Sequence, residues 1–158
     1  MQALTSVALP SLAAVPAVVL DTNVVLDWLV FGNPDCLPIV NAIEAGTWRW
    51  LVTEPMRQEL THVLGRGVLH SWAPDEARLW ATWDRLARLT AATTPAGSAL
   101  RLRCTDPDDQ KFVDLALGAA QCLISRDRAV LKLRRRAAAL GLQVLTPAQW
   151  LTATAPSH

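Results

Sequence analysis

Short apolar runs alternate with stretches of helical periodicity along this chain. The predicted strands are Ala17 to Leu20, Trp48 to Val52, Cys122 to Ser125 and Leu142 to Leu145. Short runs of this kind, bounded by polar residues, are typical of strands that are buried in a parallel sheet. Because helical patterns separate these strands, the sequence predicts an α/β fold with a mainly parallel sheet, and it contains no internal repeat.

Capping residues and apolar stripes predict the helices between the strands. Helices are expected over the following approximate ranges: Val24 to Val30, Asn33 to Gly46, Glu54 to Leu64, Pro74 to Thr90, Asp106 to Gly118 and Arg128 to Leu140. Thr146 and Pro147 predict a short final helix. A loop is expected at Thr93 to Ser98, and a short extended segment at Arg101 to Cys104.

The composition indicates one ordinary globular domain. The chain has 158 residues, of which 51% are hydrophobic, and this is enough to bury a sizeable core. Three widely spaced cysteines lack the spacing of metal ligands. Pro10 and Pro16 interrupt the apolar N-terminal segment, no Lys or Arg precedes it, and no stretch reaches membrane-spanning length. We therefore expect a cytoplasmic protein without a signal peptide.

Four acidic residues stand at positions that a metal site would require. Asp21 directly follows the first predicted strand, and Asp127 comes two residues after the third. In open parallel sheets, ligands bind outside the carboxyl ends of the strands. Glu59 lies at the edge of the apolar stripe of its helix, and Asp109 lies near the start of another helix. Each acid alone could be a helix cap or a solvated charge, but together they favour a shared site.

The run TDPDDQKF leaves the choice of its functional acid open. Asp108 and Asp109 flank the apolar stripe of the helix on opposite sides, so periodicity does not choose between them. Helix capping explains Asp106, Asp108 or Asp109 singly, but it does not easily explain all three. Asp114 falls on the opposite face, where a solvated charge is expected.

Such a group of carboxylates favours metal chemistry. Gathered carboxylates repel one another unless a cation neutralises them. Their hard oxygen atoms suit Mg²⁺ or Mn²⁺, and these ions promote hydrolysis of phosphodiesters by activating water and by stabilising negative charge. The sequence therefore indicates a metal-dependent hydrolase that acts on phosphodiester bonds.

Four segments, in this order and spacing, resemble the PIN domain family: VVLDTNVVLDWL, PMRQELTHVL, RCTDPDDQKFVDLALGA and CLISRDRAVL. The likeness is closest to bacterial toxin components of toxin–antitoxin systems. It implies a three-layer α/β/α sandwich with a Mg²⁺- or Mn²⁺-dependent ribonuclease site at the carboxyl edge of its sheet. It also implies an RNA substrate, with an antitoxin protein and a homodimer as candidate partners. We expect a single PIN-like domain over 1–158, with a core of about 17–151.

Carried over by position, the resemblance assigns four catalytic and metal-binding acids: Asp21, Glu59, Asp109 and Asp127. Asn23 and Ser125 match polar residues that orient such a site, and Asp106 and Asp108 are substitutes for Asp109. Asp27 matches a further position in the family, which we interpret as structural.

The same residues bear on two other functions. A haloacid dehalogenase-type phosphatase needs a second acid two residues after the first, but position 23 is Asn, which cannot act as a general acid or base. A non-catalytic module with the same fold, which binds RNA or a protein, is the main alternative. The net charge of +1 does not itself indicate a nucleic-acid partner, but Arg126 and Arg128 flank Asp127, and we expect these two to guide RNA phosphates.

Overall fold

A five-stranded parallel sheet forms the centre of the molecule. The computed structural model describes residues 15–97 and 102–154. The strands are β1 (Ala17–Leu20), β2 (Arg49–Val52), β3 (Ala87–Leu89), β4 (Cys122–Ile124) and β5 (Gln143–Leu145). They lie in the order β3-β2-β1-β4-β5, and each neighbouring pair is parallel. The predicted α/β fold with a parallel sheet is confirmed.

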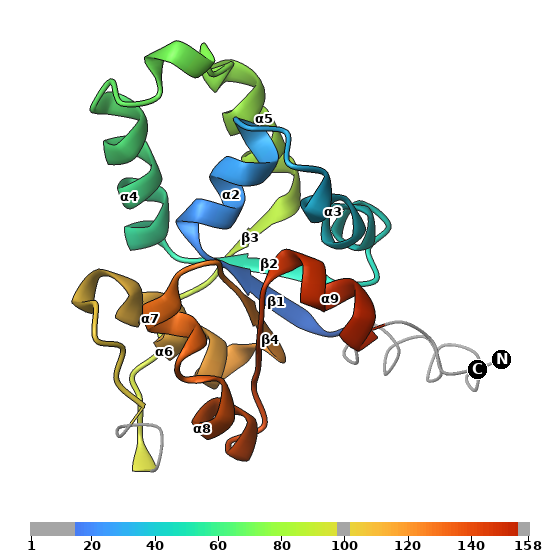
Figure 1. The fold of residues 1–158 in the computed structure, drawn as a ribbon, viewed down its shortest axis with the longest axis vertical. Coiled ribbons are helices and arrows are strands. Elements are labelled where there is room, and N and C mark those ends of the chain that lie inside the picture. Colours follow the sequence, from blue (N-terminus) through green and yellow to red (C-terminus); the bar gives the residue numbers. More distant parts are fainter. Residues whose placement is uncertain (1–14, 98–101, 155–158) are drawn as a thin grey trace, which may run out of the picture.

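Helices cover both faces of this sheet. They are α2 (Thr22–Leu29), α3 (Leu37–Glu44), α4 (Glu54–Gly65), α5 (Glu76–Leu86), α6 (Gln110–Ala119), α7 (Arg128–Leu131), α8 (Arg134–Ala139) and α9 (Pro147–Thr154). Short 3₁₀ turns precede α3, α5 and α6, namely η1 (Pro34–Cys36), η2 (His70–Trp72) and η4 (Pro107–Asp109). Figure 1 shows α2, α3, α4 and α5 on one side of the sheet and α6, α7 and α8 on the other. The α/β/α sandwich that the resemblance implied is therefore present.

The central position of β1 places its carboxyl end in the middle of the sheet edge. All four residues of β1 are buried, because helices cover both of its faces. Leu20 pairs in register with Ile124 of β4. The Asp21 backbone N–H then donates to the Ile124 carbonyl at 3.0 Å and extends this pairing by one residue. Asp21 therefore leaves the sheet beside the end of β4.

The largest difference from the predicted elements follows Pro74. The helix was predicted to reach about Thr90, but α5 ends at Leu86 and β3 continues the chain as an edge strand. In register with β2, Val52 pairs with Leu89, which is 68% exposed. A three-residue edge strand with exposed side chains carries no apolar run, so only its pairing with β2 reveals it.

The prediction of one continuous basic helix from Arg128 to Leu140 is also wrong. It is divided into α7 and α8, and at the division the Leu133 backbone N–H donates to the Val130 carbonyl at 3.0 Å, as in a tighter turn. Val130, Leu133 and Ala137 are all buried. Because their spacing is that of a continuous apolar stripe, the sequence pattern does not show the break.

The other predicted elements agree with the structure to within a few residues. Leu102 to Cys104, in the expected extended segment, form no strand of the sheet, and Gln110 binds both ends: its Nε2 donates to the Leu102 carbonyl at 3.0 Å, and its Oε1 accepts from the Cys104 N–H at 2.7 Å. Ser98 and Arg101 lie outside the described residues. In the part of the chain that the structure describes, no helix is long and apolar enough to cross a membrane.

Candidate active site

Two of the candidate acids meet at the carboxyl ends of β1 and β4. Asp21 is 2% exposed, and its Oδ2 accepts a hydrogen bond of 2.7 Å from the Ser125 hydroxyl. The Ser125 hydroxyl oxygen also accepts from the backbone N–H of Asp127 at 3.0 Å. Ser125 is fully buried, so it is a rigid link between the two strand ends. The polar residue that the sequence suggested as a support thus contacts both acids.

Asp109 joins this pair from the other side of the site. It is 8% exposed, and its Oδ2 atom is buried without a hydrogen-bond partner among the described residues. Carboxylate oxygens of Asp106, Asp109 and Asp127 lie within 4.8 Å of one another. Asp108 is exposed, and its backbone N–H donates to the Asp106 carboxylate at 3.0 Å. Of the adjacent acids Asp108 and Asp109, Asp109 is therefore the one that lies with Asp127 at the strand ends, and Asp106 joins the same group.

Burial and mutual repulsion make this a strained group of charges. The pKa of Asp109 is raised to about 8, chiefly by burial, then by the charge of Asp21 and by Asp127. Burial also raises the pKa of Asp21; the Ser125 hydrogen bond opposes that change, and the charges of Asp127 and Glu59 add to it. Without a cation, the folded protein therefore favours a proton on Asp109.

Glu59 faces the same region from α4, but both of its carboxylate oxygens are occupied. The Thr22 hydroxyl donates a short hydrogen bond to Oε2, and the Lys111 ammonium donates to Oε1 at 2.6 Å. Thr22 immediately follows Asp21, which brings Glu59 beside the other acids. Glu59 is thus near the site but already neutralised by a cation of the chain itself.

Sequence reasoning missed Thr22 and Lys111. Thr22 stands between two suggested site residues, Asp21 and Asn23, which was a usable signal. The sequence signal for Lys111 was weaker, because a single lysine at the start of a helix usually faces water. Asn23 is exposed in the structure, and its backbone N–H lowers the pKa of Asp21.

The two arginines beside Asp127 have different surroundings. The Arg126 Nη1 atom forms an ion pair of 2.6 Å with Asp27, which is 7% exposed. This contact fits the structural interpretation of Asp27, since a buried carboxylate needs a cationic partner. Arg128 is exposed and lines a shallow hollow with Lys132 and Arg135.

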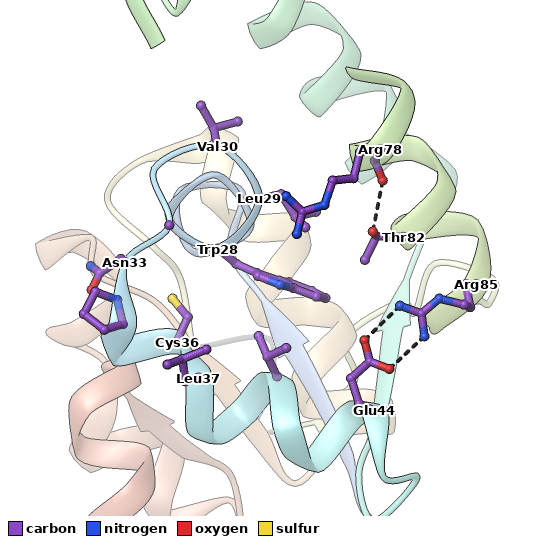
Figure 2. A pocket seen from close by; sticks show the side chains of 13 residues that line it. Trp28, Leu29, Val30, Asn33, Cys36, Leu37, Glu44, Arg78, Thr82 and Arg85 are labelled. Atoms are coloured by element: carbon purple, nitrogen blue, oxygen red, sulfur yellow. Dashed lines mark hydrogen bonds and ion pairs between the residues drawn. The ribbon is translucent and has the colours of Figure 1, made fainter. Parts of the chain in front are cut away.

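A separate pocket of about 500 Å³ lies between α2, α3 and α5 and contains none of the candidate acids. Figure 2 shows the Arg78 side chain extending over it and the ring of Trp28 below. At its rim, Arg85 binds Glu44 through two hydrogen bonds of 2.7 and 2.8 Å, which tie α5 to α3. The candidate chemistry therefore rests on the acids at the sheet edge and not on this pocket.

The acidic group fits a hard divalent cation. Three carboxylates supply oxygen ligands of the kind that Mg²⁺ and Mn²⁺ prefer. The buried, unpartnered Oδ2 of Asp109 is a second sign, because buried polar atoms almost always have a partner. A cation held by Asp109 and Asp127, with Asp21 and Asp106 beside them, would supply that partner.

Comparison with known proteins gives one match. A family model described as PIN domain matches residues 17–129, from the start of β1 into α7. No curated protein and no solved structure matches the chain. The matched region contains Asp21, Glu59, Asp109 and Asp127 and covers more than half of the sequence. The chain therefore belongs to the PIN domain family.

Proposed function

We propose that this protein is a metal-dependent endoribonuclease that hydrolyses phosphodiester bonds of RNA. One observation carries the proposal: the Asp109 carboxylate is buried next to Asp21 and Asp127 with its Oδ2 atom unpartnered, and its pKa is raised to about 8. A folded protein gains nothing in stability from such an arrangement unless a cation occupies it. Membership of a family with a nuclease-type fold supports the same conclusion.

Each residue of the site has its own role in this proposal. Asp109 and Asp127 would hold Mg²⁺ or Mn²⁺, with Asp106 in the same group of carboxylates and Asp21 beside it. Ser125 fixes the Asp21 carboxylate and the start of the loop that carries Asp127. When bound, the ion supplies Lewis-acid stabilisation of the negative charge that develops on the phosphate. Glu59 lies beside these ligands as the ion-pair partner of Lys111, and its orientation is set by Thr22 and Lys111.

Metal dependence tests this proposal directly. Purified protein is expected to cleave a labelled single-stranded RNA in Mn²⁺ or Mg²⁺ and to lose this activity completely in EDTA, because the protein's carboxylates cannot replace the ion. Gel analysis of the products measures the cleavage. Cleavage that persists in EDTA would refute the metal-dependent mechanism. RNA binding without cleavage in either ion would favour the alternative of a non-catalytic binding module.

The basic surface next to Asp127 predicts how RNA is guided. RNA binding weakens as salt rises, and the logarithm of the binding constant falls linearly with the logarithm of the salt concentration. Arg128→Ala is expected to make this slope less steep by about 0.7, the value for one phosphate contact of a single strand. With Arg126→Ala added, the total change should be roughly one unit, although loss of Arg126 also leaves Asp27 without its partner. Binding is measured by fluorescence anisotropy over a range of salt concentrations.

Arg136→Ala is the control for this experiment, because Arg136 is exposed but does not line the hollow beside Arg128. It should change the slope less than Arg128→Ala does. Equal slopes for the wild type and Arg128→Ala would place the RNA path elsewhere on the surface.

We further propose that the protein is the toxin component of a bacterial toxin–antitoxin system and acts in the cytoplasm. The support for this finer role is the sequence resemblance. Its antitoxin would be encoded by a small open reading frame next to its gene. Expression of the protein should then arrest growth, and co-expression of that neighbour should restore it. A homodimer is a second proposed assembly, which light scattering of the purified protein would test.

A further inference from the structure

Lys111 brings a fixed positive charge into the acidic site. Its ammonium group lies 2.6 Å from Glu59 Oε1 and 2.6 Å from the carbonyl oxygen of Asp108. It also lies 5.0 Å from the centre of the Phe112 ring, and Phe112 is 1% exposed. The side chain is 27% exposed, so it is not a freely solvated lysine. These three contacts hold the ammonium in one place beside Glu59.

The contacts of Glu59 join three separate parts of the fold. The carboxylate belongs to α4, its Oε2 accepts from Thr22 at the start of α2, and its Oε1 accepts from Lys111 in the first turn of α6. The Lys111 ammonium in turn binds the carbonyl of Asp108, the residue before Asp109. Through Lys111, Glu59 is thus tied to Asp108 of η4, the neighbour of the proposed metal ligand Asp109.

We propose that Lys111 is a positioning residue that keeps the Glu59 carboxylate out of direct contact with the bound metal ion. The inference rests on the proposed metal-dependent function and differs from the expectation that Glu59 is itself a ligand. With Lys111 in place, the aspartates hold the ion and Glu59 stays between Thr22 and Lys111. Without the ammonium, an uncompensated Glu59 carboxylate is attracted to the divalent cation, and a contact to Glu59 draws the ion from its place among the aspartates.

Metal affinity and catalysis should therefore change in opposite directions in Lys111→Met. Its affinity for Mn²⁺, measured by calorimetry at fixed ionic strength, is expected to rise about threefold to tenfold, the size of effect that one unit charge at a partly solvated site produces. Its kcat for RNA cleavage is expected to fall at least about tenfold, the size of effect that loss of a group supporting a metal site from outside its ligands produces. KM should change by less than about twofold, because Lys111 is held by Glu59 and Asp108 and not by the substrate.

Charge-preserving and charge-removing variants separate positioning from packing. Lys111→Arg keeps the positive charge and should return the Mn²⁺ affinity close to that of the wild type and recover part of kcat. If Lys111→Met does not fold, as judged by thermal unfolding, Lys111→Gln replaces it with the same expected rise in affinity. A merely structural role would lower stability and leave the Mn²⁺ affinity unchanged.

A double-mutant cycle with Glu59→Gln tests whether Lys111 acts through Glu59. In the Glu59→Gln background, Lys111→Met should raise the Mn²⁺ affinity much less than it does in the wild type, because there is no carboxylate to release and only the loss of repulsion between Lys111 and the ion remains. A rise of the same size in both backgrounds would overturn the inference, since simple repulsion would then account for all of it.

The same titrations distinguish this inference from the proposed function. A wild-type protein that binds no Mn²⁺ would overturn the proposed function and the inference with it. Wild-type binding together with an unchanged affinity in Lys111→Met would overturn the inference alone.

Discussion

Asp21→Asn is expected to lower kcat/KM for RNA cleavage by at least about a hundredfold, beyond the range found when only a supporting partner of a metal ligand is lost. Asparagine keeps the shape of the side chain, and its carbonyl oxygen can still accept from Ser125, but the charge that attracts the cation is gone. The protein should stay folded, because burial already disfavours the charge at this position and raises the pKa of Asp21. Cleavage of labelled RNA and thermal unfolding in EDTA are the two measurements.

A matched control for this variant is Asp84→Asn on α5. The Asp84 side chain is 69% exposed and forms an ion pair of 3.8 Å with Arg57, so the same chemical change should leave the cleavage rate unaltered. Equal activity of Asp21→Asn and the wild type, with contaminating nucleases excluded, would show that the sheet edge is not the active site.

The strand-end acids could be located from the sequence because the ends of buried strands are visible there. Ala17–Leu20 is a continuous apolar run, so the place of Asp21 after it is fixed by the pattern of residues alone. Cys122–Ile124 gives the same information about Asp127. Parallel strands bring their carboxyl ends to one edge, and this physical rule joined two acids that are distant along the chain.

The choice between Asp108 and Asp109 could not be made from periodicity. The prediction treated the DPDD run as the first turn of an α-helix, with 3.6 residues per turn. The chain instead makes the 3₁₀ turn η4 over Pro107–Asp109 before α6 begins. This tighter turn has about three residues per turn, and it changes the direction in which each side chain points. Asp109 is buried as a result, and Asp108 is exposed.

Contacts between elements were the other part that the sequence did not reveal. Lys111 meets Glu59 across two helices, and nothing in the pattern of either helix indicates the partner. Strand β3 exists because of its pairing with β2, and its edge position removes the apolar run that marks the central strands. In both cases the decisive interaction is a tertiary contact, and local sequence patterns do not predict it.

Without metal, the stability of the protein is expected to fall as the pH rises from about 4 to about 8, and Asp109 is the main cause. The ordinary pKa of an aspartate is 3.8, whereas that of Asp109 is raised to about 8 by burial and by the neighbouring acids. Between these two values the folded state binds more protons than the unfolded chain, so the free energy of unfolding decreases with rising pH. The decrease ends above about pH 8, where Asp109 is ionised in both states. Melting temperatures in EDTA measure it.

Asp109→Asn removes the titrating group and should flatten this pH dependence, so that the variant is more stable than the wild type at about pH 9 in EDTA. Asp108→Asn is the matched control, because Asp108 is the adjacent acid but is exposed, and its stability profile against pH should follow that of the wild type.

A cation replaces the proton in the folded protein, so the affinity of the wild type for Mn²⁺ should rise by up to about tenfold per pH unit below about pH 8. The same Mn²⁺ should restore stability to the wild type at high pH but much less to Asp109→Asn. Identical pH profiles for the wild type and Asp109→Asn would show that Asp109 does not carry the buried charge on which the proposed metal site depends.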